Sequence, residues 1–315
     1  MKYALLTYST TNLGDDIQSL AAAQFLPRVD TLLDRDHLDE YGAGIPTALI
    51  CNGWWAHRPT TWPPPPEVRP FLISMHIRQH GPSLERFTSP DLRRFYERHG
   101  PVGCRDEYTL QRLQSAGVPA YFSGCLTLTF PRYDGPRSNR IVFADPFGPG
   151  DFSRTCAHVG DQWWRSVPEV IRRDAIIVTH HVETSCSKHQ RLARARALLD
   201  TYRQARLVIT NRLHAALPCV AMGTPVVLIE PRYEPSRLSG LDHLFSMHNR
   251  ADAVAGRWDI DWCDPRTRSV DIEPLRRDLI ERCTRYVNTF TEEHATCSTS
   301  PQPQTAATGS TCPRC

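Results

Sequence analysis

The sequence predicts an α/β protein with two Rossmann-like domains that face a cleft. Short apolar runs alternate with helical patterns along most of the chain, which is typical of parallel sheets covered by helices. A length of 315 residues suits about two domains. Residues 131–139, rich in Pro, Gly, Arg, Asp, Ser and Asn, separate two such series. We therefore expect domains at residues 1–135 and 136–295.

The first series opens with an apolar strand, a polar turn and a helical pattern, which is the order of a ligand-binding βα unit. The proline run at residues 62–66 predicts an irregular surface loop. The expected strands are residues 3–8, 48–51, 71–76, 102–104 and 120–122. The expected helices are residues 15–25, 92–99 and 106–116.

The second series repeats the alternation without repeating the sequence. Its expected strands are residues 140–144, 175–181, 207–210 and 225–229. Its expected helices are residues 162–172, 189–205, 213–222 and 274–289. Residues 296–315 contain mainly Ser, Thr, Pro, Gln, Ala and Gly. Such a composition buries too little apolar surface to fold, so we expect a disordered tail.

Composition excludes several classes of protein. The net charge is +3 from 37 basic and 34 acidic residues, with no long basic cluster, so the sequence does not indicate binding to nucleic acid. No apolar run approaches the length of a membrane span. The apolar start, residues 3–6, is too short for the core of a signal peptide. We therefore expect a cytoplasmic protein, and nothing in the sequence indicates its oligomeric state.

Cysteine is abundant, with 11 residues at irregular spacing. In a chain without a secretion signal, they predict free thiols in a reducing compartment. Cys312 and Cys315 form a CxxC pair after Cys297, which alone is a weak indication of zinc. His180 and His181 are adjacent, and neighbours on a strand point to opposite faces. We therefore expect no metal.

The strongest local feature is the motif TNRLH at residues 210–214, where an expected strand passes into a helix. A helix N-terminus offers free N–H groups and positive potential, so it suits an anion. Arg212 adds a guanidinium, and His214 adds a side chain that exchanges protons near neutral pH. The alternative is a purely structural cap with Asn211 as the capping residue.

The turn after the first expected strand, NLGDDIQ, is the second candidate. Asn12 and Gly14 permit a tight turn of the backbone toward a ligand. Asp15 or Asp16 suits the cap of the following helix. A plain capped turn explains the same residues equally well.

Arginines follow two other expected strands. Arg105 stands at the end of one strand, and Asp106 starts the next helix, where it suits an N-cap. Arg105 has no evident structural role, which favours an anionic ligand. Arg232 and Arg237 follow the strand at residues 225–229 and suit a phosphate and a carboxylate. The alternative for this last pair is surface charge.

Asn52 belongs to a further turn that carries two tryptophans. Trp54 and Trp55 follow it directly after Gly53. Indole rings stack on sugar faces or fill a core, and we favour core packing for this pair.

Together these segments resemble the polysaccharide pyruvyl transferase family over about residues 1–290. The resemblance rests on NLGD with Gln18, on GCRD at residues 103–106 and on SGCLT at residues 123–127. It is strongest at RLHA, which begins at Arg212, together with the Gly-Thr-Pro sequence at residues 223–225. It implies a glycosyltransferase-B-like enzyme that moves the enolpyruvyl unit of phosphoenolpyruvate onto a sugar, forms a pyruvate ketal and releases phosphate.

The resemblance also implies roles for single residues. His214 would be the general base, while Arg212 and Arg105 would hold the anionic groups of the donor. The family often has a lysine where this chain has Arg237. The arginine keeps the positive charge but lacks the point-like geometry of a lysine ammonium. The first domain would face the acceptor and the second the donor. The other expected substrate-binding residues are Asn12, Gly14, Asp15, Gln18, Asn52, Asp106 and Asn211.

Two other functions stay open at this point. A nucleotide-sugar glycosyltransferase on the same plan would use the arginines on a diphosphate. A catalytically inactive relative would bind its ligand without releasing phosphate. With phosphoenolpyruvate as the donor substrate no cofactor is expected, and the acceptor would be a sugar or glycan precursor.

Overall fold

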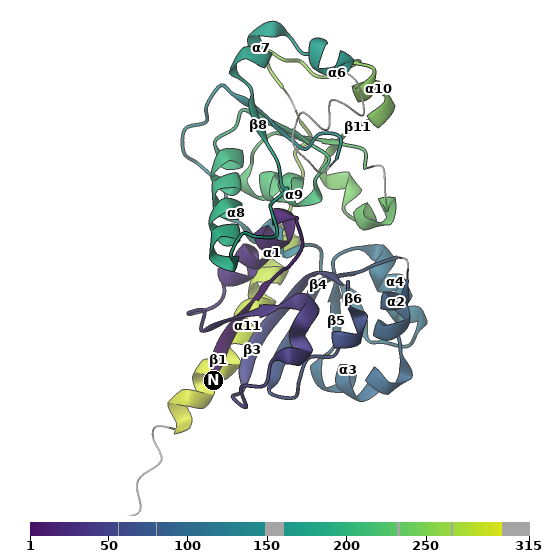
Figure 1. Cartoon of the computed structure of the whole chain (residues 1–315), viewed down its shortest axis with the longest axis vertical. Helices are drawn as coiled ribbons and strands as arrows, with labels where there is room; N and C mark the ends of the chain where they lie inside the picture. Colours follow the sequence, from purple (N-terminus) through teal and green to yellow (C-terminus); the bar gives the residue numbers. More distant parts are fainter. Residues whose placement is uncertain (56, 80, 149–160, 232–233, 266, 298–315) are drawn as a thin grey trace, which may run out of the picture.

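The computed structural model describes the chain except for residues 56, 80, 149–160, 232–233, 266 and 298–315. It is an α/β structure with two parallel sheets, which lie one above the other in Figure 1. The expected disordered tail, together with Cys312 and Cys315, lies outside the described residues, except for its first two residues, which end the last helix.

The first sheet has the strand order β2-β1-β3-β4-β5-β6, and all neighbouring strands are parallel. The chain places β2 on one side of β1 and then β3 on the other, so the strand order reverses between β1 and β3. The strands are β1 (Lys2–Thr7), β2 (Thr31–Asp34), β3 (Thr47–Trp55), β4 (Val68–Ile77), β5 (Val102–Cys104) and β6 (Ala120–Phe122).

The second sheet has the order β11-β10-β9-β7-β8 and is also parallel. Here the order reverses between β7 and β9. Ligands of such sheets bind beyond the carboxyl ends of the strands at the reversal. The strands are β7 (Ile141–Ala144), β8 (Ile176–Val178), β9 (Leu207–Thr210), β10 (Val226–Ile229) and β11 (Ser246–His248).

Helices cover both sheets (Figure 1). In the first half they are α1 (Leu13–Ala23), η1 (Arg35–Glu40), η2 (Pro59–Thr61), α2 (Pro82–Phe87), η3 (Pro90–Leu92), α3 (Arg93–His99), α4 (Glu107–Ser115) and η4 (Leu126–Thr129). In the second half they are α6 (Gln162–Arg165), α7 (Glu169–Asp174), α8 (Lys188–Arg203), α9 (Leu213–Met222), η5 (Pro235–Leu238), η6 (Asp242–Leu244), α10 (Arg250–Val254) and α11 (Glu273–Cys297).

The structure differs from the expected elements at a few places. The helix expected over residues 162–172 is two short helices, α6 and α7. Pro168 lies between them, and a proline disfavours helical backbone in the residue before it. Strands β2 and β11 were not predicted; they have only four and three residues, too few for a clear periodic pattern.

The last helix, α11, joins the two halves. Figure 1 shows it running from the junction of the two halves along the first sheet. The Tyr286 hydroxyl accepts a hydrogen bond from the Leu49 backbone N–H at 2.9 Å, and its ring stacks on Phe71 with 4.9 Å between centroids. The expected second domain therefore ends in a helix that packs on the first sheet.

One apolar core extends through both halves. It includes Leu5 and Ile50 of the first sheet together with Val208 and Leu228 of the second. Helix α1 packs against α8 and α9 at the junction (Figure 1). A shared core of this kind fixes how the carboxyl ends of the two sheets are placed relative to each other.

Several expectations about side chains can be compared with the structure. Trp55 is buried and packs edge-on against Trp62 at 4.8 Å, as expected. Trp54 departs from the expected core packing: it is half-buried, and Arg35 and Arg78 lie over its ring. Among the residues described, the buried cysteines are free thiols, namely Cys51, Cys104, Cys125, Cys219 and Cys283. No helix in the described part of the chain is both long and apolar enough to span a bilayer.

Candidate functional site

His214 lies in the first turn of α9, directly after β9 at the reversal of the second sheet. Its backbone departs from the helical form, with φ −88° and ψ 15°. Pro218 stands four residues later, has no N–H to donate to the His214 carbonyl, and crowds it. The imidazole is buried, and its Nε2 has no hydrogen-bond partner among the described residues.

Arg105 brings a second unpaired polar group to this region. It follows β5, and its side chain is 0% exposed. None of its three guanidinium nitrogens has a hydrogen-bond partner within the described structure. Within the described residues it forms an ion pair with Asp106, with 3.4 Å between Nε and Oδ2. Burying a guanidinium that makes no hydrogen bond is costly, so this arrangement favours an anionic ligand.

Arg237 adds a further positive charge next to Arg105. Burial, together with the charge of Arg105, lowers the pKa of Arg237 to about 10. The Nε atom of Arg237 also lacks a partner in the described part of the chain. Burial and the charges of Arg105 and Arg237 hold the pKa of His214 well below its usual value. His214 is therefore a neutral base surrounded by cations at neutral pH.

The loop that carries Arg237 is fixed on the first half of the molecule. Ser239 accepts hydrogen bonds from the first two N–H groups of α4: its carbonyl from Glu107 at 3.1 Å, and its Oγ from Tyr108 at 2.9 Å. Gly240 has φ +78°, and a Cβ there would lie 2.9 Å from the Glu107 side chain. Only glycine suits this close, left-handed turn, which holds Arg237 beside Arg105.

His76, on β4, completes the first-sheet side of the site. Its Nδ1 lies 2.6 Å from Oδ2 of Asp106, and its Nε2 has no partner in the structure as described. Asp106 also caps α4, accepting from the Thr109 N–H at 3.0 Å. Burial and Arg105 lower the pKa of His76 to about 4. Asp106 thus does more than the expected capping.

His180 follows β8 and contributes a third buried imidazole. Its Nε2 lies 2.8 Å from the Tyr202 hydroxyl. Its Nδ1 faces Gly14, where a Cβ would come within 3.3 Å, and has no partner among the described atoms. Burial lowers the pKa of His180 to about 3, with a further contribution from Arg212.

Asn211 and Arg212 bind the segment that leaves β7. Arg212 Nε donates to Asp145 at 2.9 Å, and its side chain is 20% exposed. With its amide turned to satisfy both partners, Asn211 donates to the Asp145 carbonyl at 2.8 Å and accepts from Gly148 N–H at 3.1 Å. Arg212, not Asn211, is the N-cap of α9. These contacts fix both segments at the reversal between β7 and β9.

The turn after β1 holds its polar residues mainly through local contacts. Asn12 is the N-cap of α1 and accepts from Gly14 N–H at 3.1 Å, so neither Asp15 nor Asp16 is the capping residue. Asp15 accepts a hydrogen bond from Thr10 Oγ1 at 2.9 Å. Its negative charge offsets part of the lowering of the Arg237 pKa. Its position therefore belongs to the same electrostatic neighbourhood.

Gln18 and Asn52 meet at the reversal between β1 and β3. Asn52 Nδ2 donates to the Gln18 carbonyl at 2.8 Å. Their side-chain oxygens, Gln18 Oε1 and Asn52 Oδ1, are buried and have no partner in the part of the chain that is described. These two acceptors suit the hydroxyls of a sugar.

A buried ion pair joins the two halves beside this turn. Arg191 of α8 meets Asp16 of α1, with 2.6 Å between Nη2 and Oδ2 and 3.2 Å between Nε and Oδ1. Arg191 also donates to the carbonyls of Thr10 and Asn12. The backbone of Leu13 donates to the His180 carbonyl at 2.8 Å. Asp16 is thus a structural partner that links the halves.

The structure brings most of the expected residues to the reversal points of the two sheets. Arg105, Asp106, Arg237 and His214 form one electrostatic cluster, and Asp15 acts on it. Sequence reasoning missed His76 and Asp145, and it considered His180 only as a metal ligand. Each of the three stands within one residue of the end of an expected strand, and that position was the available signal.

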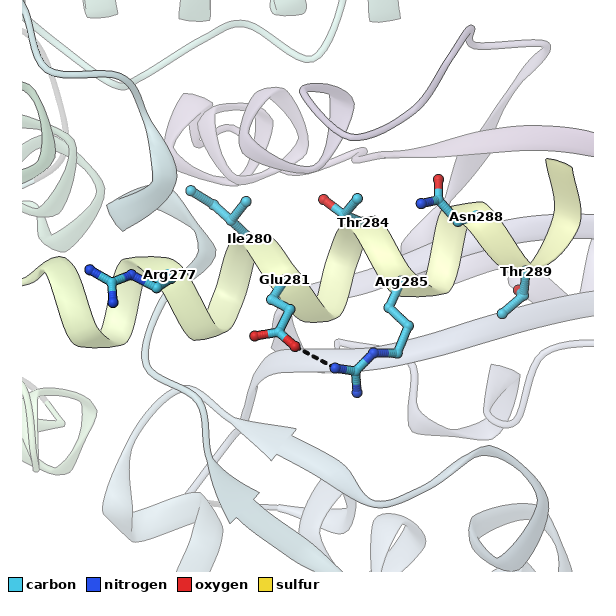
Figure 2. Close-up of a pocket in the computed structure, with 7 residues that line it drawn as sticks. All are labelled: Arg277, Ile280, Glu281, Thr284, Arg285, Asn288 and Thr289. Carbon is cyan, nitrogen blue, oxygen red and sulfur yellow. Dashed lines mark hydrogen bonds and ion pairs between the residues drawn. The ribbon is translucent and has the colours of Figure 1, made fainter. Parts of the chain in front are cut away.

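A groove elsewhere on the molecule contains none of these residues. Figure 2 shows that it follows one face of α11, where Glu281 and Arg285 form an ion pair of 2.5 Å. Its other lining residues are Arg277, Ile280, Thr284, Asn288 and Thr289. In the described ranges, no three His, Cys, Asp or Glu side chains gather as a metal site requires.

Comparison with known proteins agrees with the motifs. The polysaccharide pyruvyl transferase family model matches residues 12–233, a range that includes Arg105 and His214. No curated protein matches the chain. A solved structure described as the S. aureus MnaA–UDP co-structure covers 96% of this chain and 99% of its own, at 10% identity and a TM-score of 0.46. The chain belongs to the polysaccharide pyruvyl transferase family.

Proposed function

We propose that the protein transfers the enolpyruvyl group of phosphoenolpyruvate to two hydroxyls of a sugar or glycan precursor, forming a pyruvate ketal and releasing phosphate. Family membership supports a transferase of this kind. Because phosphoenolpyruvate is made in the cytosol, we place the reaction there. The two halves would meet at a cleft, as in glycosyltransferase-B enzymes.

The single observation that supports this donor most strongly is that the buried guanidinium of Arg105 makes no hydrogen bond within the described structure. Its buried guanidinium offers donors on three nitrogens, and no described group accepts from them. Arg237 stands close enough for the two charges to oppose each other. A ligand with both a phosphate and a carboxylate supplies several acceptors and neutralises both arginines. Arg212, fixed by Asp145 and partly exposed, would bind the same ligand.

His214 suits the removal of a proton from the acceptor. Its pKa lies well below the usual value, so the imidazole is neutral and Nε2 can accept a proton at neutral pH. Bound phosphoenolpyruvate would bring negative charge beside Arg105 and Arg237. That charge raises the pKa of His214 and stabilises the imidazolium that forms as the hydroxyl is deprotonated.

The reaction balances as an addition followed by a substitution at the same carbon. In the first, the enol carbon C3 gains a proton and becomes a methyl group, while an acceptor oxygen bonds to C2 and loses its proton. In the second, another acceptor oxygen bonds to C2 and loses its proton, while the bond from C2 to the phosphate oxygen breaks and the phosphate leaves with one proton. The arginines stabilise the charge on the departing phosphate.

Replacing His214 with Gln tests the proposed base. Phosphate release from phosphoenolpyruvate is measured with an acceptor found by screening sugars and glycan precursors on the unaltered protein. Loss of a general base is expected to lower kcat about 10²–10⁴-fold. Binding of phosphoenolpyruvate, measured by calorimetry, is expected to change far less, because the arginines remain.

The matched control is His189→Gln, which alters an exposed histidine on α8. This control is expected to keep full activity. A His214→Gln protein that releases phosphate as fast as the control would show that His214 is not the base.

A further inference from the structure

His76 and Asp106 form a buried acid–base pair that the steps above leave unused. Both side chains are 0% exposed, and Nδ1 lies 2.6 Å from Oδ2. An ionised carboxylate only accepts hydrogen bonds, so the neutral His76 ring carries its proton on Nδ1. Its Nε2, which has no partner in the described residues, is then free to exchange a proton with a ligand. The same arrangement orients a histidine in hydrolytic triads.

The backbone is distorted just before His76. Ser74 has φ +54°, a strained value for a residue other than glycine. The register between β3 and β4 shifts at this point: Cys51 pairs with Leu72, whereas Gly53 pairs with Met75. One extra residue in β4 moves the side chains beyond it to the opposite face. The distortion therefore determines that His76 faces Asp106 and Arg105.

The two buried histidines have different charged neighbours. The groups that act on His76 are Arg105 and Arg237, which are positive, and Asp106, which is negative. For His214 the largest charge effects come from Arg105 and Arg237. An anion that neutralises the arginines would leave His76 in contact with the Asp106 carboxylate, whereas Nε2 of His214 has no hydrogen-bond partner among the described residues. Of the two rings, His76 is therefore the one that a bound anion makes easier to protonate.

We propose that His76, oriented by Asp106, is the acid that protonates C3 of the donor, while His214 takes the proton of the first acceptor hydroxyl. This inference rests on the proposed function. In the substitution step the roles exchange: protonated His214 gives its proton to the departing phosphate, and His76 takes the proton of the second hydroxyl. Both rings then return to their starting states, so the proton count closes.

The test is nitrogen NMR of the full chain labelled in its histidine rings, with phosphoenolpyruvate alone as the probe. At about pH 6.5, the ordinary pKa of histidine, the His76 ring is expected to be neutral without ligand. Phosphoenolpyruvate is expected to convert it to the doubly protonated form, an upward pKa shift from about 4. H76Q assigns the signal.

D106N provides the sharper variant. Asparagine keeps the side-chain oxygen that caps α4, so the fold is preserved while the negative charge beside His76 is removed. In D106N, His76 is expected to stay neutral when phosphoenolpyruvate binds. Glu97→Gln removes an exposed charge on α3 and is expected to leave the shift unchanged.

The outcomes separate this inference from the proposed function. If phosphoenolpyruvate alters the His214 signal while His76 stays neutral, the donor site stands and His76 is not the acid. If phosphoenolpyruvate protonates His76 in the D106N variant as fully as in the unaltered protein, Asp106 is not the positioning residue of His76 and the inference fails. If no histidine signal responds to phosphoenolpyruvate, the donor assignment itself fails, and this inference with it.

Discussion

Arg105→Met is expected to stabilise the protein and to abolish donor binding at the same time. Methionine fills a similar volume without a charge, so the cost of burying a guanidinium that makes no hydrogen bond disappears and the repulsion of Arg237 is relieved. Asp106 loses a charged neighbour but keeps its hydrogen bonds with His76 and Thr109. The free energy of unfolding is expected to rise by about 1–3 kcal/mol. Affinity for phosphoenolpyruvate is expected to fall about 100-fold or more, because a buried charged partner of the ligand is lost.

Chemical denaturation and calorimetry measure the two effects. Arg94→Met on α3 alters an exposed arginine and is expected to change stability by less than about 0.5 kcal/mol. A gain in the free energy of unfolding together with a loss of binding identifies a residue that serves function although it lowers the stability of the fold. An Arg105→Met protein that is less stable than the unaltered chain would contradict this explanation.

Arg191→Met is expected to have the opposite effect on stability. Arg191 is as deeply buried as Arg105, but it is fully paired with Asp16 and with two backbone carbonyls. Its removal leaves the Asp16 carboxylate buried without a partner. Breaking a buried ion pair in this way is expected to cost about 3–5 kcal/mol of unfolding free energy, measured by denaturation at neutral pH.

The double variant Asp16→Asn with Arg191→Met is the control. With both charges removed, most of the stability is expected to return, because no unpaired charge remains. A single Arg191→Met variant that unfolds at the same denaturant concentration as the unaltered protein would show that the pair does not stabilise the junction of the halves.

Most strands, and the residues that follow their carboxyl ends, were predictable from sequence. Apolar runs bounded by turn residues located most strands, and the rule that ligands bind at the carboxyl ends of parallel strands pointed to Arg105 and His214. The motif order then indicated the family. Both inferences use only local pattern, which a single sequence contains.

Partners distant in the sequence were not predictable. His76 and Asp106 lie 30 positions apart, and Asp16 and Arg191 lie 175 apart; no periodic pattern connects such pairs. From the sequence, Asp106 is predicted only as a helix cap, and the contact of its second carboxylate oxygen with His76 appears only in the structure. The backbone distortion of β4 at Ser74 likewise depends on tertiary packing, which overrides local preference.

The most direct test of the central claim is the thermal unfolding of the unaltered protein with phosphoenolpyruvate, with nucleotide sugars in parallel. A ligand at about 100 times its dissociation constant adds about 2.7 kcal/mol of stability, which raises Tm by a few degrees in a chain of this size. The account predicts that rise with phosphoenolpyruvate and its loss in Arg105→Met. A rise with nucleotide sugars alone, or with neither ligand, would contradict it.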